Sequence, residues 1–163
     1  VMQISRREPP KPEYLLLSEW LNEFVGSYLK TLNRHAEVTI DCNYPELLVE
    51  FDPENLQRVI ANLLDNALRH SKLASGKEIA KIKVSLDFAG QQCMLDVIDI
   101  GAGVPPQDQE KLFEPFFTTV EEGSGMGLFL CQELCEINNA SLSYRPTDGG
   151  ESCFRISMNQ RAL

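Results

Sequence analysis

The fold is decided by the stretch Cys93-Met-Leu-Asp-Val-Ile-Asp99-Ile-Gly-Ala-Gly-Val-Pro105, which predicts a strand running into a glycine turn. Side chains alternate across a strand, so three apolar side chains share one face with Asp99. A carboxylate on this buried face needs a partner, because burying it unpaired is costly. Gly101 and Gly103 follow, where the backbone can turn sharply or let another group come close. Asp99 is therefore predicted either to accept from a ligand with a polar donor edge or to cap local backbone N–H groups.

The composition indicates one globular domain of 163 residues, 43% of them hydrophobic and 24% charged. A net charge of −9 argues against nucleic acid or an anionic membrane as the main partner, but leaves a phosphate ligand open. No apolar run approaches the ~20 residues that span a bilayer, and no signal peptide is visible at Val1. The five cysteines are odd in number and lack Cys-x-x-Cys spacing, which predicts free core thiols in a reducing compartment.

The order of the predicted elements indicates a two-layer α/β sandwich, with a mixed, largely antiparallel sheet covered on one face by about three helices. Residues 8–12 are rich in proline and predict a linker, after which 13–163 form one domain. Helices are predicted from an N-cap at Ser18 to Leu32, from an N-cap at Asp52, near 107–113, and from Ser124 to Ile137. Strands are predicted at 37–42, 47–51, 79–88, 93–99, 141–145 and 153–158.

The helix that begins after Asp52 carries three polar side chains opposite its apolar stripe. Asn62, Asn66 and Arg69 fall within roughly 60° of one another at about 100° per residue. Amide oxygens are ligands suited to Mg²⁺, and a guanidinium is a forked donor to phosphate. The alternative is an ordinary solvated helix face.

Two later segments add weaker signals. Gly123-Ser-Gly-Met-Gly127-Leu precedes a helix, whose free N–H groups attract anions, although a flexible loop would have the same composition. Leu112-Phe-Glu-Pro-Phe-Phe-Thr-Thr119 places three phenylalanines in a loop. These rings either fill part of the core or anchor a mobile cover over a site.

These segments, in this order and with Gly149-Gly-Glu-Ser-Cys-Phe154 after them, resemble the catalytic, ATP-binding domain of sensor histidine kinases. The resemblance covers about Leu47 to Met158 and is strongest to the nitrogen-regulatory and pilus-regulatory branch. The wider relatives are ATPases of the gyrase type. It implies the Bergerat ATP-binding fold, with 13–163 as the catalytic domain and 1–12 as the end of an upstream dimerisation helix and its linker.

The resemblance implies a site for ATP and Mg²⁺. Asn66 would ligate Mg²⁺, with help from Asn62, and Asp99 would accept from the exocyclic amine of adenine. Arg69 and the glycine segment would contact phosphates, and Phe113, Phe116 and Phe117 would anchor the lid. The implied ATP-binding residues are Asn62, Asn66, Arg69, His70, Asp99, Gly101, Gly103, Val104, Thr119, Gly123, Ser124, Gly125, Met126, Gly127, Leu128 and Ser152.

The chain departs from the related sequences at two places. Val120-Glu-Glu122 stands where related lids often carry a lysine, and two acids repel a triphosphate. Asn62 stands where gyrase-type relatives hold a glutamate, and an amide cannot act as the general base that activates water. Asn62 therefore favours phosphate transfer over hydrolysis.

The phosphoacceptor histidine of the family has no match here, because neither His35 nor His70 has the expected sequence context. We therefore expect a catalytic domain that passes the γ-phosphate to a histidine on a separate dimerisation domain, for relay to a response regulator. The isolated chain is expected to be a cytoplasmic monomer that does not phosphorylate itself. The full protein is expected to be a homodimer, with an inner-membrane anchor left open.

Three alternatives stay open from the sequence. A nucleotide-sensing module that regulates by contact, without phosphotransfer, is favoured by Val120-Glu-Glu122. An autonomous ATPase of the gyrase kind is disfavoured by Asn62. A binder related to anti-sigma serine kinases is disfavoured by the segment before residue 13.

Overall fold

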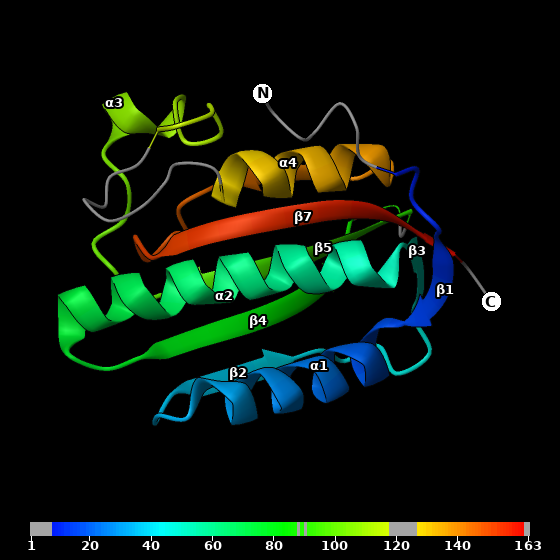
Figure 1. Ribbon diagram of the computed structural model, residues 1–163, viewed down its shortest axis with the longest axis horizontal. Coiled ribbons are helices and arrows are strands. Elements are labelled where there is room, and N and C mark those ends of the chain that lie inside the picture. Colours follow the sequence, from blue (N-terminus) through cyan, green and yellow to red (C-terminus); the bar gives the residue numbers. More distant parts are fainter. Residues whose placement is uncertain (1–7, 88, 90, 118–126, 162–163) are drawn as a thin grey trace.

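A seven-stranded sheet forms one layer of the protein, and three long helices that lie side by side form the other (Figure 1). The computed structural model describes residues 8–87, 89, 91–117 and 127–161. The strands are β1 (Glu13–Leu16), β2 (Glu37–Asp41), β3 (Leu48–Phe51), β4 (Ile79–Leu86), β5 (Gln92–Asp99), β6 (Ser141–Tyr144) and β7 (Ser152–Arg161). The helices are α1 (Leu17–Leu32), α2 (Pro53–Ser75), the short α3 (Pro106–Gln109) and α4 (Gly127–Ile137). Within these residues, no helix combines the length and the apolar character that a membrane span requires.

The sheet is mixed and largely antiparallel, as the sequence predicts. Its strand order is β1-β3-β7-β5-β4-β2, and β6 also pairs with β7. Only the pair β2–β4 is parallel among the described strands, and all other pairs are antiparallel. In the register of β5 and β7, Asp99 lies directly opposite Ser152. This pairing brings the end of one predicted site segment against the start of another.

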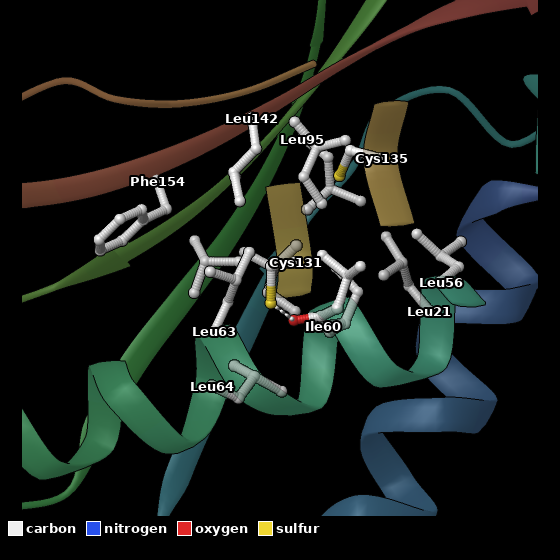
Figure 2. Packing of buried hydrophobic residues seen from close by; sticks show 14 of the residues in the cluster. Leu21, Leu56, Ile60, Leu63, Leu64, Leu95, Cys131, Cys135, Leu142 and Phe154 are labelled. Carbon is white, nitrogen blue, oxygen red and sulfur yellow. Dashed lines mark hydrogen bonds between the residues drawn. The ribbon is translucent and has the colours of Figure 1, made fainter. Parts of the chain in front are cut away.

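The core lies between the helices and one face of the sheet. In β5 the side chains of Cys93, Leu95 and Val97 are all buried, as the alternation of the strand predicts. Figure 2 shows Leu95, together with residues of β6 and β7, facing the apolar stripe of α2 and the cysteines of α4. The prediction that helices cover one face of the sheet is therefore confirmed.

The opposite face of the sheet carries a buried ion pair. Asp96 of β5 and Arg155 of β7 are register partners, and two guanidinium nitrogens donate to the two carboxylate oxygens at 2.8 and 3.0 Å. This forked geometry matches a guanidinium to a carboxylate. The carboxylate in turn raises the pKa of Arg155 through these hydrogen bonds.

The longest helix, α2, begins where the sequence predicts. The Asp52 carboxylate accepts from the backbone N–H groups of Glu54 and Asn55, at 2.9 and 3.2 Å, and Pro53 occupies the first turn. The helix ends at Gly76, whose φ of 78° suits a residue without a side chain. The other oxygen of Asp52 accepts from the N–H of Lys11 at 2.8 Å, which fixes the segment before β1 to the start of α2.

The start of α1 corrects the sequence prediction. Ser18 is not the N-cap, because the helix already begins at Leu17 and no side chain caps it. The preceding residues, for which no strand was predicted, form β1 and pair with β3. The N–H of Leu17 then donates to the carbonyl of Leu47 at 3.0 Å. A backbone acceptor from the residue just before β3 thus replaces the serine cap.

The loop after β5 also differs from its predicted form. The short helix is α3, which ends at Gln109 instead of continuing to about residue 113. Successive turns follow up to Phe117. The predicted start of the next helix, at Ser124, lies outside the described residues, and α4 is seen from Gly127 onward.

The five cysteines are free thiols, and four of them are buried. Burial raises the pKa of the thiols of Cys93 and Cys131 to about 12. Both thiols are therefore neutral at pH 7 and pack as small apolar side chains, as the sequence predicts. Figure 2 shows Cys131 and Cys135 of α4 among the leucines of the core.

We expect Asp52→Ala to lower the free energy of unfolding by about 1–2 kcal/mol, because two N–H groups at the start of α2 lose their acceptor. Urea denaturation of the variant and the wild type measures the change. Glu50→Ala, which removes an exposed carboxylate of β3 two residues away, is the matched control and should change stability far less. Equal losses in the two variants would contradict the assigned cap.

Candidate functional site

The predicted site residues of the described chain gather at one end of the sandwich. The C-terminal half of α2, the start of α4 and the start of β7 all lie at the left of Figure 1, next to α3. β5 ends here too, because its last residue, Asp99, is the register partner of Ser152 at the start of β7. The topology therefore joins segments that are up to 90 positions apart in the chain, from Asn62 to Ser152.

Asp99 is a buried carboxylate with one engaged oxygen. Its side chain is 2% exposed, and its Oδ1 accepts from the N–H of Gly101 at 2.7 Å. Its Oδ2 has no hydrogen-bond partner within the described residues. Burial raises the pKa of Asp99 to about 6, although the Gly101 N–H opposes this shift. The structure thus shows the local cap that the sequence left open, and one acceptor remains for a ligand.

Gly101 marks the closest approach between the turn after β5 and α2. A Cβ at this position would lie 2.9 Å from the Cβ of His70 and 3.1 Å from its carbonyl oxygen. It would also lie 2.8 Å from Oδ1 of Asp99. Only glycine fits here, so this residue sets the distance between the end of β5 and α2.

Ser71 of α2 forms hydrogen bonds that hold the same turn against the helix. Its buried hydroxyl donates to the carbonyl of Ile79 at 2.6 Å and accepts from the N–H of Ile100 at 3.1 Å. One side chain of α2 therefore bonds to β4 and to the residue that follows Asp99. The sequence analysis missed Ser71, although it continues the apolar stripe of α2, and a buried hydroxyl requires partners.

Tyr144 of β6 forms hydrogen bonds that hold the turn against the sheet. Its hydroxyl accepts from the N–H of Val104 at 3.0 Å and from the hydroxyl of Ser152 at 3.2 Å. The amide of Gln109 donates to the carbonyl of Val104 at 3.0 Å, so both backbone polar groups of that residue are bonded. The sequence predicts a strand residue at 144 but gives no sign of its partner, which lies 40 positions away.

The polar face of α2 forms the second half of the site. Asn66 accepts from the guanidinium of Arg69 at 3.1 Å, and the amide nitrogen of Asn62 donates to the carbonyl of Arg58 at 3.0 Å. A Cβ on Gly127 would lie 3.7 Å from Oδ1 of Asn62, which places the start of α4 beside this helix face. The three predicted side chains of α2 are therefore brought together with the end of the glycine segment.

His70 connects the two halves of the site. It is half-buried, and burial together with the nearby charge of Arg69 lowers the pKa of its imidazole. The ring is therefore neutral at pH 7. Its backbone contacts the turn after β5, and Arg69 precedes it in the chain.

Two of the three phenylalanines after α3 pack against the core, as one of the two predicted roles requires, and the third does not. Phe113 packs against the core and meets Phe154 edge to face, with ring centroids 6.2 Å apart. Phe117 also packs against the core, whereas Phe116 is 69% exposed and has a φ of 69°. Two rings therefore anchor this segment, and one is presented to solvent.

Several predicted residues lie outside the described part of the chain. The structure places Asn62, Asn66, Arg69, His70, Asp99, Gly101, Gly103, Val104, Gly127, Leu128 and Ser152. Thr119, Gly123, Ser124, Gly125 and Met126 lie outside the described residues, and so does the acidic segment 120–122.

The donor set suits a magnesium–phosphate ligand. In the described part of the chain, no group of three His, Cys, Asp or Glu side chains could hold a metal ion by itself. Mg²⁺ commonly keeps several waters and takes phosphate oxygens with only one or two protein ligands. The amide oxygens of Asn62 and Asn66 fit that limited role, and Arg69 adds a positive charge beside them.

A groove of about 610 Å³ opens elsewhere, between α1 and α2. It is lined by Phe24, Ser27, Tyr28, Thr31, Glu54, Gln57, Arg58 and Ala61. None of the predicted site residues lines it, so it is separate from the site at the end of β5.

Comparison with known proteins finds an ATPase family and two sensor proteins to which the chain is similar. The family model described as histidine kinase-, DNA gyrase B-, and HSP90-like ATPase matches residues 51–162. The chain is 40% identical over 157 residues to the sensor protein kinase PilS of Pseudomonas aeruginosa, and 30% identical over 154 residues to the sensor protein KdpD of Escherichia coli. These matches cover 96% and 90% of the chain, but the chain spans only 30% of PilS and 17% of KdpD.

Solved structures share the fold. The catalytic domain of the histidine kinase ThkA superposes with a TM-score of 0.76 at 22% identity, over 91% of this chain and 95% of that one. Full-length ShkA, solved in complex with AMPPNP, gives a TM-score of 0.76 at 17% identity, over 94% of this chain and 32% of that one. The predicted sandwich architecture is confirmed by these likenesses as well.

We expect Gly101→Ala to destabilise the protein by about 1–3 kcal/mol, because its methyl group would overlap the backbone of α2 and the side chain of Asp99. Thermal and urea unfolding measure the loss. Gly26→Ala is the matched control, since a Cβ there meets nothing within 4 Å and the residue lies within α1. The control should be neutral or slightly stabilising. Equal behaviour of the two variants would contradict the close approach.

We expect Asp99→Asn to raise the free energy of unfolding at pH 7 by an amount on the order of 2 kcal/mol. The pKa of Asp99 lies above its ordinary value of 3.8, at about 6, so the ionised carboxylate destabilises the folded state. This penalty disappears as the pH falls through 6 towards 4, and the gap between variant and wild type should close over that range. Urea denaturation at several pH values tests this, with exposed Asp148→Asn as the control. A gap that does not depend on pH would exclude the raised pKa.

Proposed function

Because this chain belongs to the family of histidine kinase-, DNA gyrase B- and HSP90-like ATPases, we propose that it binds Mg-ATP and donates the γ-phosphate to a protein histidine. Membership of the family confirms the resemblance that the motifs carry, and the chain is similar to the sensor protein kinase PilS and the sensor protein KdpD. The chain corresponds to the ATP-binding catalytic domain of such kinases. Phosphotransfer, the metal and the partners are the parts that we propose.

The adenine end of the site is the buried carboxylate of Asp99. Its Oδ2 has no hydrogen-bond partner among the described residues, and an unpaired buried carboxylate oxygen is costly. A ligand that donates a hydrogen bond to Oδ2 would therefore be favoured. The exocyclic amine of adenine is such a donor. Ser152, directly opposite Asp99 in the sheet, supports this end. The half-buried His70 lines the pocket between adenine and the phosphates.

The phosphate end is the polar face of α2. Asn66, with Asn62 one turn earlier, supplies amide oxygens to a bound Mg²⁺, which neutralises phosphate charge. Arg69 is within hydrogen-bond distance of Asn66 and can turn its guanidinium to phosphate oxygens. The backbone N–H groups at the start of α4, next to Asn62, add partial positive charge that also attracts phosphate.

The observation that carries the proposal is the fixed distance between these two ends. Gly101 packs against the backbone of His70, which follows Arg69 directly. This one close contact therefore connects the turn after Asp99, the adenine acceptor, to the residues of α2 that would contact phosphate. Such a frame positions a nucleotide, and positioning with charge stabilisation is the main catalytic contribution in phosphoryl transfer. Asn62 offers no general base for water, which favours transfer to a partner over hydrolysis.

The histidine that receives phosphate is proposed to lie on a dimerisation domain outside residues 13–163, with residues 1–12 as the connection. A response regulator would then receive the phosphate. The chain spans less than a third of PilS, so a longer kinase would leave room for these parts. The alternative is a nucleotide-sensing module without transfer, which the acids Glu121 and Glu122 favour.

We expect the chain to bind a non-hydrolysable ATP analogue in the presence of Mg²⁺, and Asn66→Ala to weaken this binding at least tenfold. The loss should shrink when Mg²⁺ is removed with EDTA, because the variant lacks a metal ligand. Calorimetric titration measures the affinity. Asn22→Ala, on the exposed side of α1, is the matched control and should bind as the wild type does.

Radiolabelled ATP then separates the two candidate functions. The chain alone should acquire no label, and a fragment that carries the dimerisation helices should acquire acid-labile label when the chain is added. Binding without any transfer would favour the sensing module. Acid-labile label on the chain itself would show that its own histidines accept phosphate and would contradict the proposed division of roles.

A further inference from the structure

We propose that Tyr144 is a positioning residue for nucleotide binding, whose hydroxyl holds the turn after β5 in the shape that accepts adenine. The inference rests on the proposed function but concerns a residue that the family motifs do not include. Tyr144 is the last residue of β6 and lies outside every segment on which the resemblance was based.

The hydroxyl of Tyr144 is where three parts of the adenine end meet. It accepts from the N–H of Val104 at 3.0 Å and from the hydroxyl of Ser152 at 3.2 Å. A Cβ on Gly103, whose φ is +81°, would lie 3.4 Å from this oxygen. The tyrosine therefore fits closely against a turn that glycine alone adopts without strain.

The engaged hydroxyl links two residues that flank the adenine acceptor. Val104 ends the turn that begins at Asp99, and Ser152 faces Asp99 across the sheet. A phenylalanine at 144 would leave the Val104 N–H without an acceptor and the Ser152 hydroxyl free to rotate. The turn between Gly101 and Val104 would then lose its contact with the sheet and keep only those of Ser71, Gly101 and Gln109 among the contacts described above.

The ring of Tyr144 is held in place by its neighbours. It meets Phe154 with centroids 5.1 Å apart and planes at 64°, and Phe154 meets Phe113 edge to face at 6.2 Å. Phe154 is buried, and Figure 2 shows it at the edge of the core. These ring contacts limit the rotation of the Tyr144 side chain and help to hold its hydroxyl in place. They also connect the adenine end to Phe113, in the segment that leads towards the predicted lid.

The first test compares Tyr144→Phe with the wild type in hydrogen exchange and in titration with a non-hydrolysable ATP analogue. The amides of residues 101–104 should exchange faster in the ligand-free variant, because the acceptor of the Val104 N–H is lost. The affinity for the analogue with Mg²⁺ should fall by about fivefold, as expected for one neutral hydrogen bond. Both measurements are made well below the melting temperature of either protein.

A control and a second background separate positioning from general loss of structure. Tyr44→Phe removes a hydroxyl from another partly buried tyrosine and should change neither measurement. In a Ser152→Ala background Tyr144→Phe should still lower the affinity several-fold, because the Val104 N–H still loses its acceptor there. A purely structural role would lower the melting temperature of Tyr144→Phe but leave exchange at 101–104 and the affinity unchanged below that temperature.

The outcomes distinguish this inference from the proposed function. If the wild type does not bind the analogue, the proposed function fails, and this inference fails with it. If the wild type binds and Tyr144→Phe binds equally well, only the role of Tyr144 is overturned. Unchanged exchange at 101–104, or disappearance of the whole affinity loss in the Ser152→Ala background, would overturn it as well.

Discussion

At Gly101 the turn after β5 comes so near to α2 that no side chain can stand between them. The rest of the site is arranged around this contact. Here Gly101 packs against His70, and the buried hydroxyl of Ser71 accepts a hydrogen bond from the N–H of Ile100. Helix and sheet are thereby fixed to each other by backbone, which side-chain rotation cannot loosen. The carboxylate of Asp99 and the amides of α2 keep their separation before any ligand arrives.

Asp99 shows why such a frame is needed. A carboxylate with a raised pKa and a single N–H donor is held in its buried position by the surrounding structure, against its own preference for water. Strained or poorly solvated groups of this kind concentrate at functional sites, where stability and activity have different requirements. In this protein the buried ion pair Asp96–Arg155, in the same strand but on the other face, is the useful contrast. Asp96 has two guanidinium donors, whereas Asp99 has one backbone donor and an Oδ2 without a hydrogen-bond partner among the described residues.

The sequence predicts those features that depend on local pattern. The alternation in β5 and the apolar stripe of α2 correctly give the buried face of each, and the cap at Asp52 is correctly placed, because all three follow from residues a few positions apart. The face shared by Asn62, Asn66 and Arg69 follows from helical geometry in the same way.

Other features depend on partners far away in the chain, and the sequence does not give them. The cap at Ser18 was wrong because β1 pairs with β3 and the carbonyl of Leu47 already serves the helix start. Ser71 and Tyr144 bond to groups 29 and 40 positions away, respectively. A hydroxyl on a buried face signals that a partner exists without telling which one. Recognition of family motifs fills part of this gap, but only for residues inside the motifs.

The position of β7 has a consequence for how the molecule is assembled. This last strand has β5 on one side and both β6 and β3 on the other, and among the described strands it provides the only link between the β1–β3 pair and the rest of the sheet. During synthesis on the ribosome, α1 and the paired strands β1 and β3 would leave the exit tunnel long before β7, the strand that joins them to β5. The sheet then closes in one late step that brings distant segments together, which is slow by its nature. Until that step the edge of β5 that pairs with β7 is open, and an open strand edge is a site for pairing with other chains.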